Sequence, residues 1–165
     1  MNRLVGIVAV AFLAAAFPLL MASAELPGVA AAEVEFSAAG HGSMAFGHQG
    51  EGRGYFKFDL QQVDGQITGT LLFAAEAHHE MMFPNVIVRL SNIEKSSFGR
   101  HRVKFSGQGA LHNDPVSVTV TAYDNASSRK ADRFVIKCVG NHGKVIFEAD
   151  GEVFLGDLTV GPAAD

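Results

Sequence analysis

Val116-Ser-Val-Thr-Val-Thr-Ala-Tyr-Asp124, followed by Asp132-Arg-Phe-Val-Ile-Lys-Cys138, decides the fold class of this 165-residue chain. In the first segment, apolar residues at even positions alternate with Ser, Thr and Tyr at odd positions. A period of two places the apolar side chains on one face of an extended strand, whereas the period of a helix would scatter them. Both segments are therefore predicted to be half-buried β-strands.

The same alternation recurs along most of the chain, and turn residues separate the segments. Val63-Asp-Gly-Gln66 carries the Asp-Gly pair of a tight hairpin, and no amphipathic helix is apparent. About nine short strands at this spacing are typical of a single antiparallel β-sandwich or barrel. We expect this domain to span residues 33–160, with strands near 33–37, 55–61, 67–73, 86–93, 103–111, 116–123, 133–139, 144–149 and 153–160.

The first 24 residues have the pattern of a signal peptide. Arg3 supplies a positive charge, an apolar run follows, and Ala22-Ser-Ala24 offers a cleavage site. Pro18 interrupts the run, which disfavours the alternative of an uncleaved anchor. We expect cleavage after Ala24, a flexible lead-in over 25–32, a frayed tail over 161–165, and a secreted or periplasmic protein without a stable membrane span.

Cleavage would leave 12 of the 13 basic side chains against 17 acidic ones. An acidic balance disfavours nucleic acid as a partner. An extracellular protein, a glycan or a small ligand remain as candidate partners. The single cysteine, Cys138, cannot form an internal disulfide, and its spacing from Phe134 and Ile136 predicts a buried core thiol.

A resemblance to a known family rests on alternating residues and glycines. The motifs are Gly54-x-Phe-x-Phe58, Gly65-x-Ile-x-Gly-x-Leu71, Val103-x-Phe-x-Gly-x-Gly109, Val118-x-Val-x-Ala-x-Asp124, Asp132-x-Phe-x-Ile136 and Phe147-x-Ala-x-Gly-x-Val153. With these motifs the chain resembles, over about Val34 to Val160, the small secreted β domain that accompanies choice-of-anchor modules in bacterial surface proteins, the post-choice-of-anchor domain. The resemblance implies a compact antiparallel β domain on exported bacterial proteins, from an uncharacterised family without defined catalytic residues or ligand.

The segment Glu76-Ala-His-His-Glu-Met-Met-Phe-Pro84 combines imidazole, carboxylate and thioether groups. In an exported protein these groups suit copper or zinc. The alternative is a solvated connection whose Met residues cover the core. Adjacent His residues point to opposite faces of a strand, so only a loop would let both reach one ion. The candidate metal ligands are His78, His79, Met81 and Met82, together with His41 and His48 if the fold brings these two close to them.

Two further segments have polar or glycine-rich compositions. The glycines of 40–54 lead into an expected strand rather than a helix, so a mobile loop or bulged hairpin is favoured over a phosphate cradle. Asp114, Asp124, Asn125 and Asp132 are oxygen ligands at strand ends, but their spacing matches no calcium loop and turn chemistry explains them equally well. Asn125-Ala-Ser127 is formally a glycosylation sequon.

The sequence contains no nucleophile elbow, metalloprotease motif or singled-out carboxylate pair, and we predict no catalytic or cofactor-binding residues. The main hypothesis is an exported, non-enzymatic β domain for binding or surface structure, with specificity in loops 40–54, 78–84 and 124–132. The alternatives are a periplasmic copper or zinc binder, or a barrel that holds an apolar small molecule among its many Phe residues, either as a carrier or as an isomerase.

Overall fold

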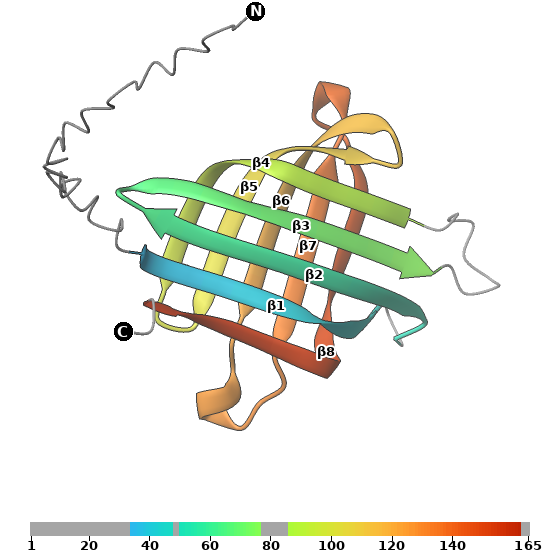
Figure 1. The fold of residues 1–165 in the computed structure, drawn as a ribbon. Coiled ribbons are helices and arrows are strands. Elements are labelled where there is room, and N and C mark those ends of the chain that lie inside the picture. The colour runs from blue at the N-terminus through green and yellow to red at the C-terminus, as the bar shows by residue number, and fades with distance from the viewer. Residues whose placement is uncertain (1–33, 48–49, 77–85, 163–165) are drawn as a thin grey trace, which may run out of the picture. The chain divides into compact units, whose positions relative to one another are not determined.

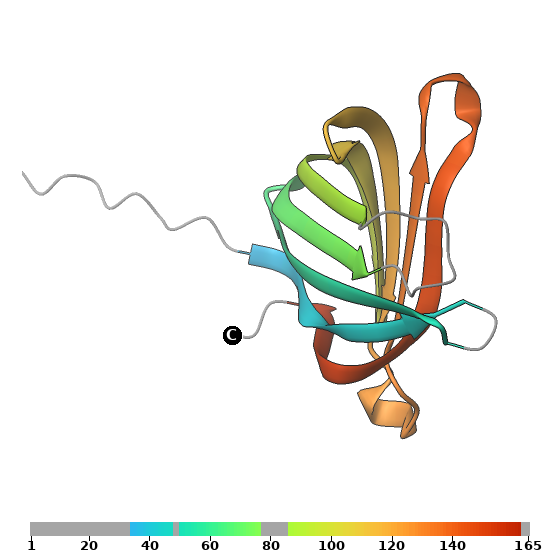
Figure 2. The same ribbon diagram turned by 90° about the vertical axis from the view of Figure 1, so that its right-hand side faces the viewer.

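In the computed structural model the chain forms a closed barrel of antiparallel strands, each paired with its neighbours in sequence (Figures 1 and 2). The structure describes residues 34–47, 50–76 and 86–162. The first and last strands pair with each other and close the barrel. The all-β prediction is confirmed, and a barrel rather than a sandwich is formed. The strands are β1 (Val34–Phe46), β2 (Gly52–Val63), β3 (Gln66–Glu76), β4 (Val86–Gly99), β5 (Arg102–Leu111), β6 (Asp114–Tyr123), β7 (Arg133–Val139) and β8 (Val145–Pro162).

The described residues form eight strands because the last two predicted strands are one bent strand, β8. Its first half pairs with β7 as far as Glu152, and its second half pairs with β1 from Gly151 to Pro162. Gly151 sits at the changeover, where an added Cβ would overlap the carbonyl oxygen of Ala45. Since only glycine allows this approach, the strand passes from one partner to the next without a break. Residues 161 and 162, expected in a frayed tail, belong to β8.

Alternate side chains of every strand point inward and form one continuous apolar core. Phe134 lies at its centre, with no exposed surface, and its ring stacks on Phe56 at a centroid distance of 4.3 Å. Phe73 lies 6.1 Å from Phe134 and nearly parallel to it. Small barrels fill their interiors with side chains in this way. The many Phe residues therefore pack against one another, as expected for a Phe-rich core.

The glycine-rich stretch of residues 40–54 is mostly strand and belongs to a hairpin of β1 and β2. A hairpin was one of the two forms that the sequence predicted, the other being a mobile loop. Gly40 and Gly42 lie in β1, and Gly52 and Gly54 lie at the start of β2. The two strands are paired along their length, and Phe46 opposite Gly52 is the pair nearest the turn. A Cβ on Gly54 would come within 2.8 Å of the Phe73 ring. The inward glycines make room for large core side chains, which explains their density better than chain flexibility.

The Asp-Gly turn between β2 and β3 forms where the sequence predicts it. The hairpin between β2 and β3 has Asp64 and Gly65 in the left-handed region, at φ 49° and 72°, as the Asp-Gly pair predicts. A short 3-10 turn, Asn141–Gly143, joins β7 to β8. The hairpin between β7 and β8 projects from one end of the barrel and the connection between β6 and β7 from the other (Figures 1 and 2).

Candidate binding site at the rim of the barrel

The connection between β6 and β7 is held together by its own hydrogen bonds. Asp132 Oδ1 accepts the backbone N–H of Asn125 at 2.8 Å, and Asn125 Nδ2 donates to the carbonyl of Ala131 at 2.8 Å. Asp124 Oδ1 accepts the N–H of Ala126 at 3.1 Å, the local pairing that favours Asp in turns. Within it, Ala126–Ser128 forms a single 3-10 turn. The predicted loop 124–132 is thus an ordered structure.

Hydrogen bonds also attach this connection to neighbouring strands. The Asp124 N–H donates to the carbonyl of His101 at 3.0 Å, and the Val153 N–H of β8 donates to the carbonyl of Asp132 at 2.8 Å. The carboxylate of Asp124 accepts the N–H of Val160 at 3.4 Å. Since its two ends are fixed to different parts of the rim, the connection can hold side chains in defined positions.

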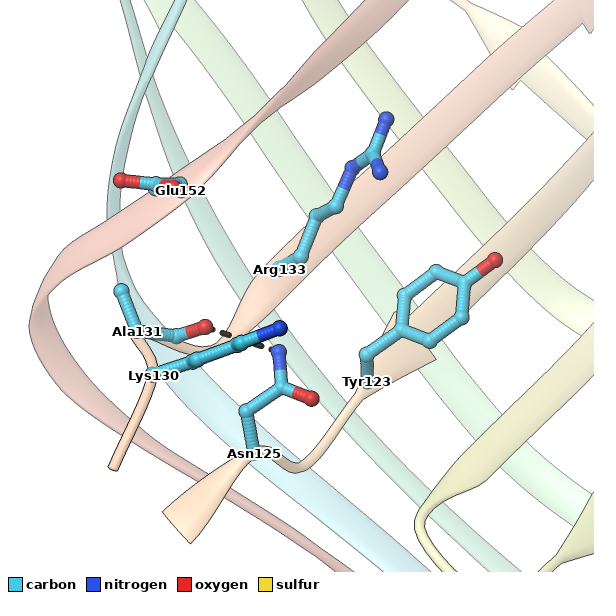
Figure 3. A pocket seen from close by; sticks show the side chains of 6 residues that line it. All are labelled: Tyr123, Asn125, Lys130, Ala131, Arg133 and Glu152. Atoms are coloured by element: carbon cyan, nitrogen blue, oxygen red, sulfur yellow. Dashed lines mark hydrogen bonds between the residues drawn. The ribbon is translucent and has the colours of Figure 1, made fainter. Parts of the chain in front are cut away.

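A hollow of about 430 Å³ lies beside this connection, and we refer to it as the rim pocket (Figure 3). Three of its residues form a row across neighbouring strands, because Tyr123 pairs with Arg133 and Arg133 pairs with Glu152. The remaining lining comes from the connection itself. The rim pocket is lined by Tyr123, Asn125, Lys130, Ala131, Arg133 and Glu152.

The guanidinium of Arg133 is fixed by Asp150 of β8. Arg133 Nε donates to Asp150 Oδ1 at 2.7 Å, and a terminal guanidinium nitrogen lies 2.5 Å from Asp150 Oδ2. This hydrogen bonding, together with the negative charge of Asp150, raises the pKa of Arg133 above its ordinary value. A two-point contact of this kind fixes the plane of the guanidinium. Arg133 therefore presents its remaining N–H groups in one orientation.

The rim pocket offers an aromatic ring, hydrogen-bond donors and acceptors, and charges of both signs. Asn125 uses its amide nitrogen on Ala131, which leaves its side-chain oxygen as an acceptor. Lys130 brings a cation and Glu152 a carboxylate. These groups are suited to hydrogen-bonding a polar molecule.

The predicted metal ligands are only partly within the described residues. His41 is exposed in the middle of β1, where it pairs with Lys57 and Asp157. In ranges 34–47, 50–76 and 86–162, no group of three or more His, Cys, Asp or Glu side chains could hold a metal ion. The other predicted ligands, His48, His78, His79, Met81 and Met82, lie outside the described residues.

The predicted oxygen-ligand set does not form a calcium site. Asp124 and Asp132 direct carboxylate oxygens to backbone N–H groups, as the turn interpretation expected. Arg133, the neighbour of Asp132 in sequence, pairs with Asp150 of β8. Cys138 is fully buried, and its burial raises the pKa of the thiol to about 12. The prediction of a core thiol is confirmed.

Sequence reasoning identified the connection 124–132 but missed Tyr123, Arg133 and Glu152 as pocket residues. Tyr123 and Arg133 were seen only as strand residues flanking the loop. Glu152 reaches the pocket through its register with β7, which no local pattern reveals. Within the part of the chain that the structure describes, no helix is long and apolar enough to cross a membrane.

Comparison with protein-family models, with curated proteins and with solved structures found no match for this chain. The resemblance to the post-choice-of-anchor domain therefore stays a prediction. The function has to be argued from the barrel and its rim.

Proposed function

We propose that this chain is an exported, non-enzymatic binding domain that holds its ligand at the rim pocket. The observation that carries the proposal is this polar hollow, lined by residues that a hydrogen-bonded connection and a two-point ion pair hold in place. Its barrel acts as a rigid scaffold, because its interior is occupied by packed side chains. Binding at loops on a rigid scaffold is a common division of labour in β domains.

The chemistry of the rim pocket favours a saccharide unit of a glycan. Sugars present many hydroxyl groups, which need donors and acceptors together, and Arg133, Lys130, Asn125 and Glu152 supply both. Sugars also present apolar C–H faces, which an aromatic ring such as Tyr123 can cover. The mixture of charges makes a strongly anionic or cationic ligand less suitable than a neutral polar one.

The test uses the tyrosines as reporters, because the chain has two Tyr residues and no Trp. In a Tyr55→Phe variant, Tyr123 is the remaining tyrosine, and its fluorescence reports the rim pocket. We expect maltotriose, chitotriose or xylotriose to change this fluorescence in a saturable manner. Tyr123→Ala should abolish binding measured by calorimetry, whereas Tyr55→Ala, the matched control on the outer wall of β2, should leave it unchanged.

Two results would contradict the proposal. One is equal loss of saccharide binding in the two alanine variants, which would place the ligand elsewhere. The other is the absence of binding to these sugars and to a broad glycan array by the folded protein.

A second candidate function is copper or zinc binding at the end of the barrel where β1 and β3 end. Strands β1 and β3 both run antiparallel to β2, and Arg53 pairs with Ala45 near the end of β1 and with Glu76 at the end of β3. The sequence segments that carry His48 and His78 follow these two strand ends. The topology thus starts both segments from the same end of the barrel.

The metal test is a titration of the purified protein with Cu²⁺ or Zn²⁺ at micromolar free metal. We expect binding that is lost when His78 and His79 are both replaced by Ala and kept when His41 is replaced, since His41 lies in the middle of β1. A protein that takes up neither metal would remove this candidate.

The alternative of an apolar ligand inside the barrel has less support. The Phe rings that would line such a cavity stack on one another, with Phe56 and Phe134 at 4.3 Å. A ligand there would have to displace side chains that are already packed.

A further inference from the structure

Strands β2, β1 and β8 lie side by side in one wall of the barrel (Figure 1). The outward side chains of this wall have a regular arrangement. Register places three outward-facing rows across these strands, with β1 in the middle of each. Outward residues of β1 in these rows are Ala45, Ser43 and His41, and the flanking strands carry longer side chains. The rows read Arg53–Ala45–Glu152, Tyr55–Ser43–Leu155 and Lys57–His41–Asp157.

The middle row exposes apolar surface at the centre of this wall. Leu155 is 67% exposed, Tyr55 is 44% exposed, and Ser43 between them is only 6% exposed although it points outward. A bulge in β8 opposite Ser43 turns an extra residue, Phe154, outward, with 55% of its surface exposed. Clustered exposed apolar side chains with a polar rim are typical of interaction surfaces.

The charges on the two flanking strands are opposite. On β2 the outward residues are Arg53, Tyr55 and Lys57, so an aromatic ring lies between two cations. On β8 the corresponding residues are Glu152, Leu155 and Asp157, so an apolar side chain lies between two carboxylates. In the described part of the chain, the salt bridges are Arg133 to Asp150 and Lys137 to Glu148, and these four outer-wall charges take part in neither. The Arg53 guanidinium lies 5.8 Å from the centre of the Phe154 ring.

We propose that this wall binds a second copy of the chain, related by a two-fold axis that runs along β1. Rotation about this axis places β2 of one copy against β8 of the other. Lys57 then faces Asp157 of the partner subunit, and Tyr55 faces Leu155 of the partner subunit. Arg53 likewise faces Glu152 of the partner subunit. Each contact occurs twice, as in any interface of this symmetry.

The charge pattern of this wall indicates that its partner is a second copy of the chain. A surface with cations on one side of an axis and carboxylates on the other matches itself after rotation, whereas an unrelated partner would need the same pattern independently. The small side chains on β1 lower the middle of a convex wall, which lets the flanking columns of two barrels approach each other. Because about three strands per copy make contact, we expect an interface near the small end of the usual range and a dissociation constant on the order of micromolar.

The test reverses one charge on each flanking strand. The wild-type protein should form a dimer in sedimentation velocity and light-scattering experiments as its concentration rises. Lys57→Asp and Asp157→Lys should each weaken dimerisation by roughly tenfold or more, because both symmetric pairs become repulsive. Lys104→Asp, which reverses an exposed lysine on β5, is the matched control and should not weaken it.

Mixing the two reversed variants gives the sharpest result. A heterodimer of Lys57→Asp with Asp157→Lys restores opposite charges at both pairs, so equimolar mixing should recover dimers that neither variant forms alone. The double variant Lys57→Asp/Asp157→Lys should dimerise by itself for the same reason. Melting temperatures of all variants check that each one is folded.

Three outcomes would overturn the proposal. A wild-type protein that stays monomeric up to about millimolar concentration would do so, since contacts weaker than this are not specific interfaces. Dimers that are indifferent to both single reversals would show that a different surface, or a different partner, is involved. Single variants that fail to associate when mixed, although each is folded, would refute the two-fold arrangement. Lys57 and Asp157 do not line the rim pocket, and Glu152, which belongs to both surfaces, is left unchanged in every variant. Saccharide binding by the monomeric reversed variants therefore tests the rim pocket in the absence of the dimer, and the two proposals can fail separately.

Discussion

Replacing Phe134 by Ala tests whether the barrel interior is packed or holds a ligand. Phe134 has no exposed surface and lies within 4.3 Å of Phe56, 6.0 Å of Phe58 and 6.1 Å of Phe73, measured between ring centroids. It therefore connects strands on opposite sides of the barrel. Among the described side chains, Phe58 also contacts three rings of the core, but its nearest ring lies 5.6 Å away, against 4.3 Å for Phe134.

The expected cost follows from the size of the removed ring. Truncation of a fully buried Phe lowers the free energy of unfolding by about 3 to 5 kcal/mol, because apolar contacts are lost and a cavity remains. Stacked aromatic pairs contribute about 0.5 to 1.5 kcal/mol each beyond their buried area. With three ring neighbours, we expect a loss of about 4 kcal/mol, which is a large part of the roughly 5 to 15 kcal/mol of a typical domain.

The assay is urea unfolding followed by circular dichroism at 25 °C. With a slope of about 1 to 3 kcal/mol per molar urea, the midpoint should fall by about 2 M. Phe154→Ala is the matched control, because the same truncation at a side chain that is 55% exposed removes mainly the contact with Arg53. Its cost should stay below about 1 kcal/mol.

An equal effect of the two substitutions would refute the packed interior. In that case the Phe residues would line a space rather than fill it, and the apolar-ligand alternative would gain support. A further check is benzene, which should raise the melting temperature of Phe134→Ala and leave that of the wild-type protein unchanged, since a dry cavity the size of a ring can bind it.

Other substitutions test the bend of β8, the core thiol and the rim. Gly151→Ala should strongly lower the melting temperature, because the added Cβ would overlap a carbonyl oxygen of β1. Gly161→Ala should have little effect, because the space around Gly161 is open. For the core thiol, burial raises the pKa of Cys138 from 9.0 to about 12, so the folded state holds the thiol proton more tightly than the unfolded state. The free energy of unfolding should therefore fall as pH rises from about 9 through about 12, by up to ~4 kcal/mol, and Cys138→Ala measured over the same range should lack this contribution. Asp150→Asn breaks the pair with Arg133, whose two side chains are about half exposed. It should lower the free energy of unfolding by less than about 1 kcal/mol, and the loss should shrink in 1 M salt. A large loss that is independent of salt would show that solvent does not screen the pair.

The fold class could be predicted because apolar and polar residues alternate along each strand. Val116 to Ala122 sorts its residues by parity, and the structure buries the even positions Val116, Val118, Val120 and Ala122. The turn at Asp64 and Gly65 could be predicted because its backbone geometry selects those residues. Closure of the barrel could not, since pairing of β1 with β8 depends on register between distant segments.

The role of the glycines could be predicted only in part. The dense run from Gly40 to Gly54 predicts a mobile loop or a bulged hairpin, and the structure has a hairpin of β1 and β2. The sequence does not show why so many glycines lie within the strands themselves. In the barrel, Gly40, Gly54 and Gly151 lie where a Cβ would collide with Phe rings, a Leu side chain or a backbone carbonyl. The collisions of Gly40 with Leu158 and of Gly151 with Ala45 involve strands far apart in sequence. The other collisions involve neighbouring strands and depend on their register, so the packing role of glycine becomes visible only in three dimensions. The rim pocket shows the same limit, because Glu152 joins Tyr123 only through β7.

The pairing of β1 with β8 also has a consequence for the order of folding. Phe46 pairs with Gly151, 105 positions later, and Phe36 pairs with Pro162, 126 positions later. Such high contact order slows folding to milliseconds or seconds, since a long loop must close before these pairs form. During synthesis, one edge of β1 stays open until nearly all of the chain has been made. The barrel therefore becomes stable late and all at once, and the segment that completes it is the same bent strand that carries Phe154 and Leu155.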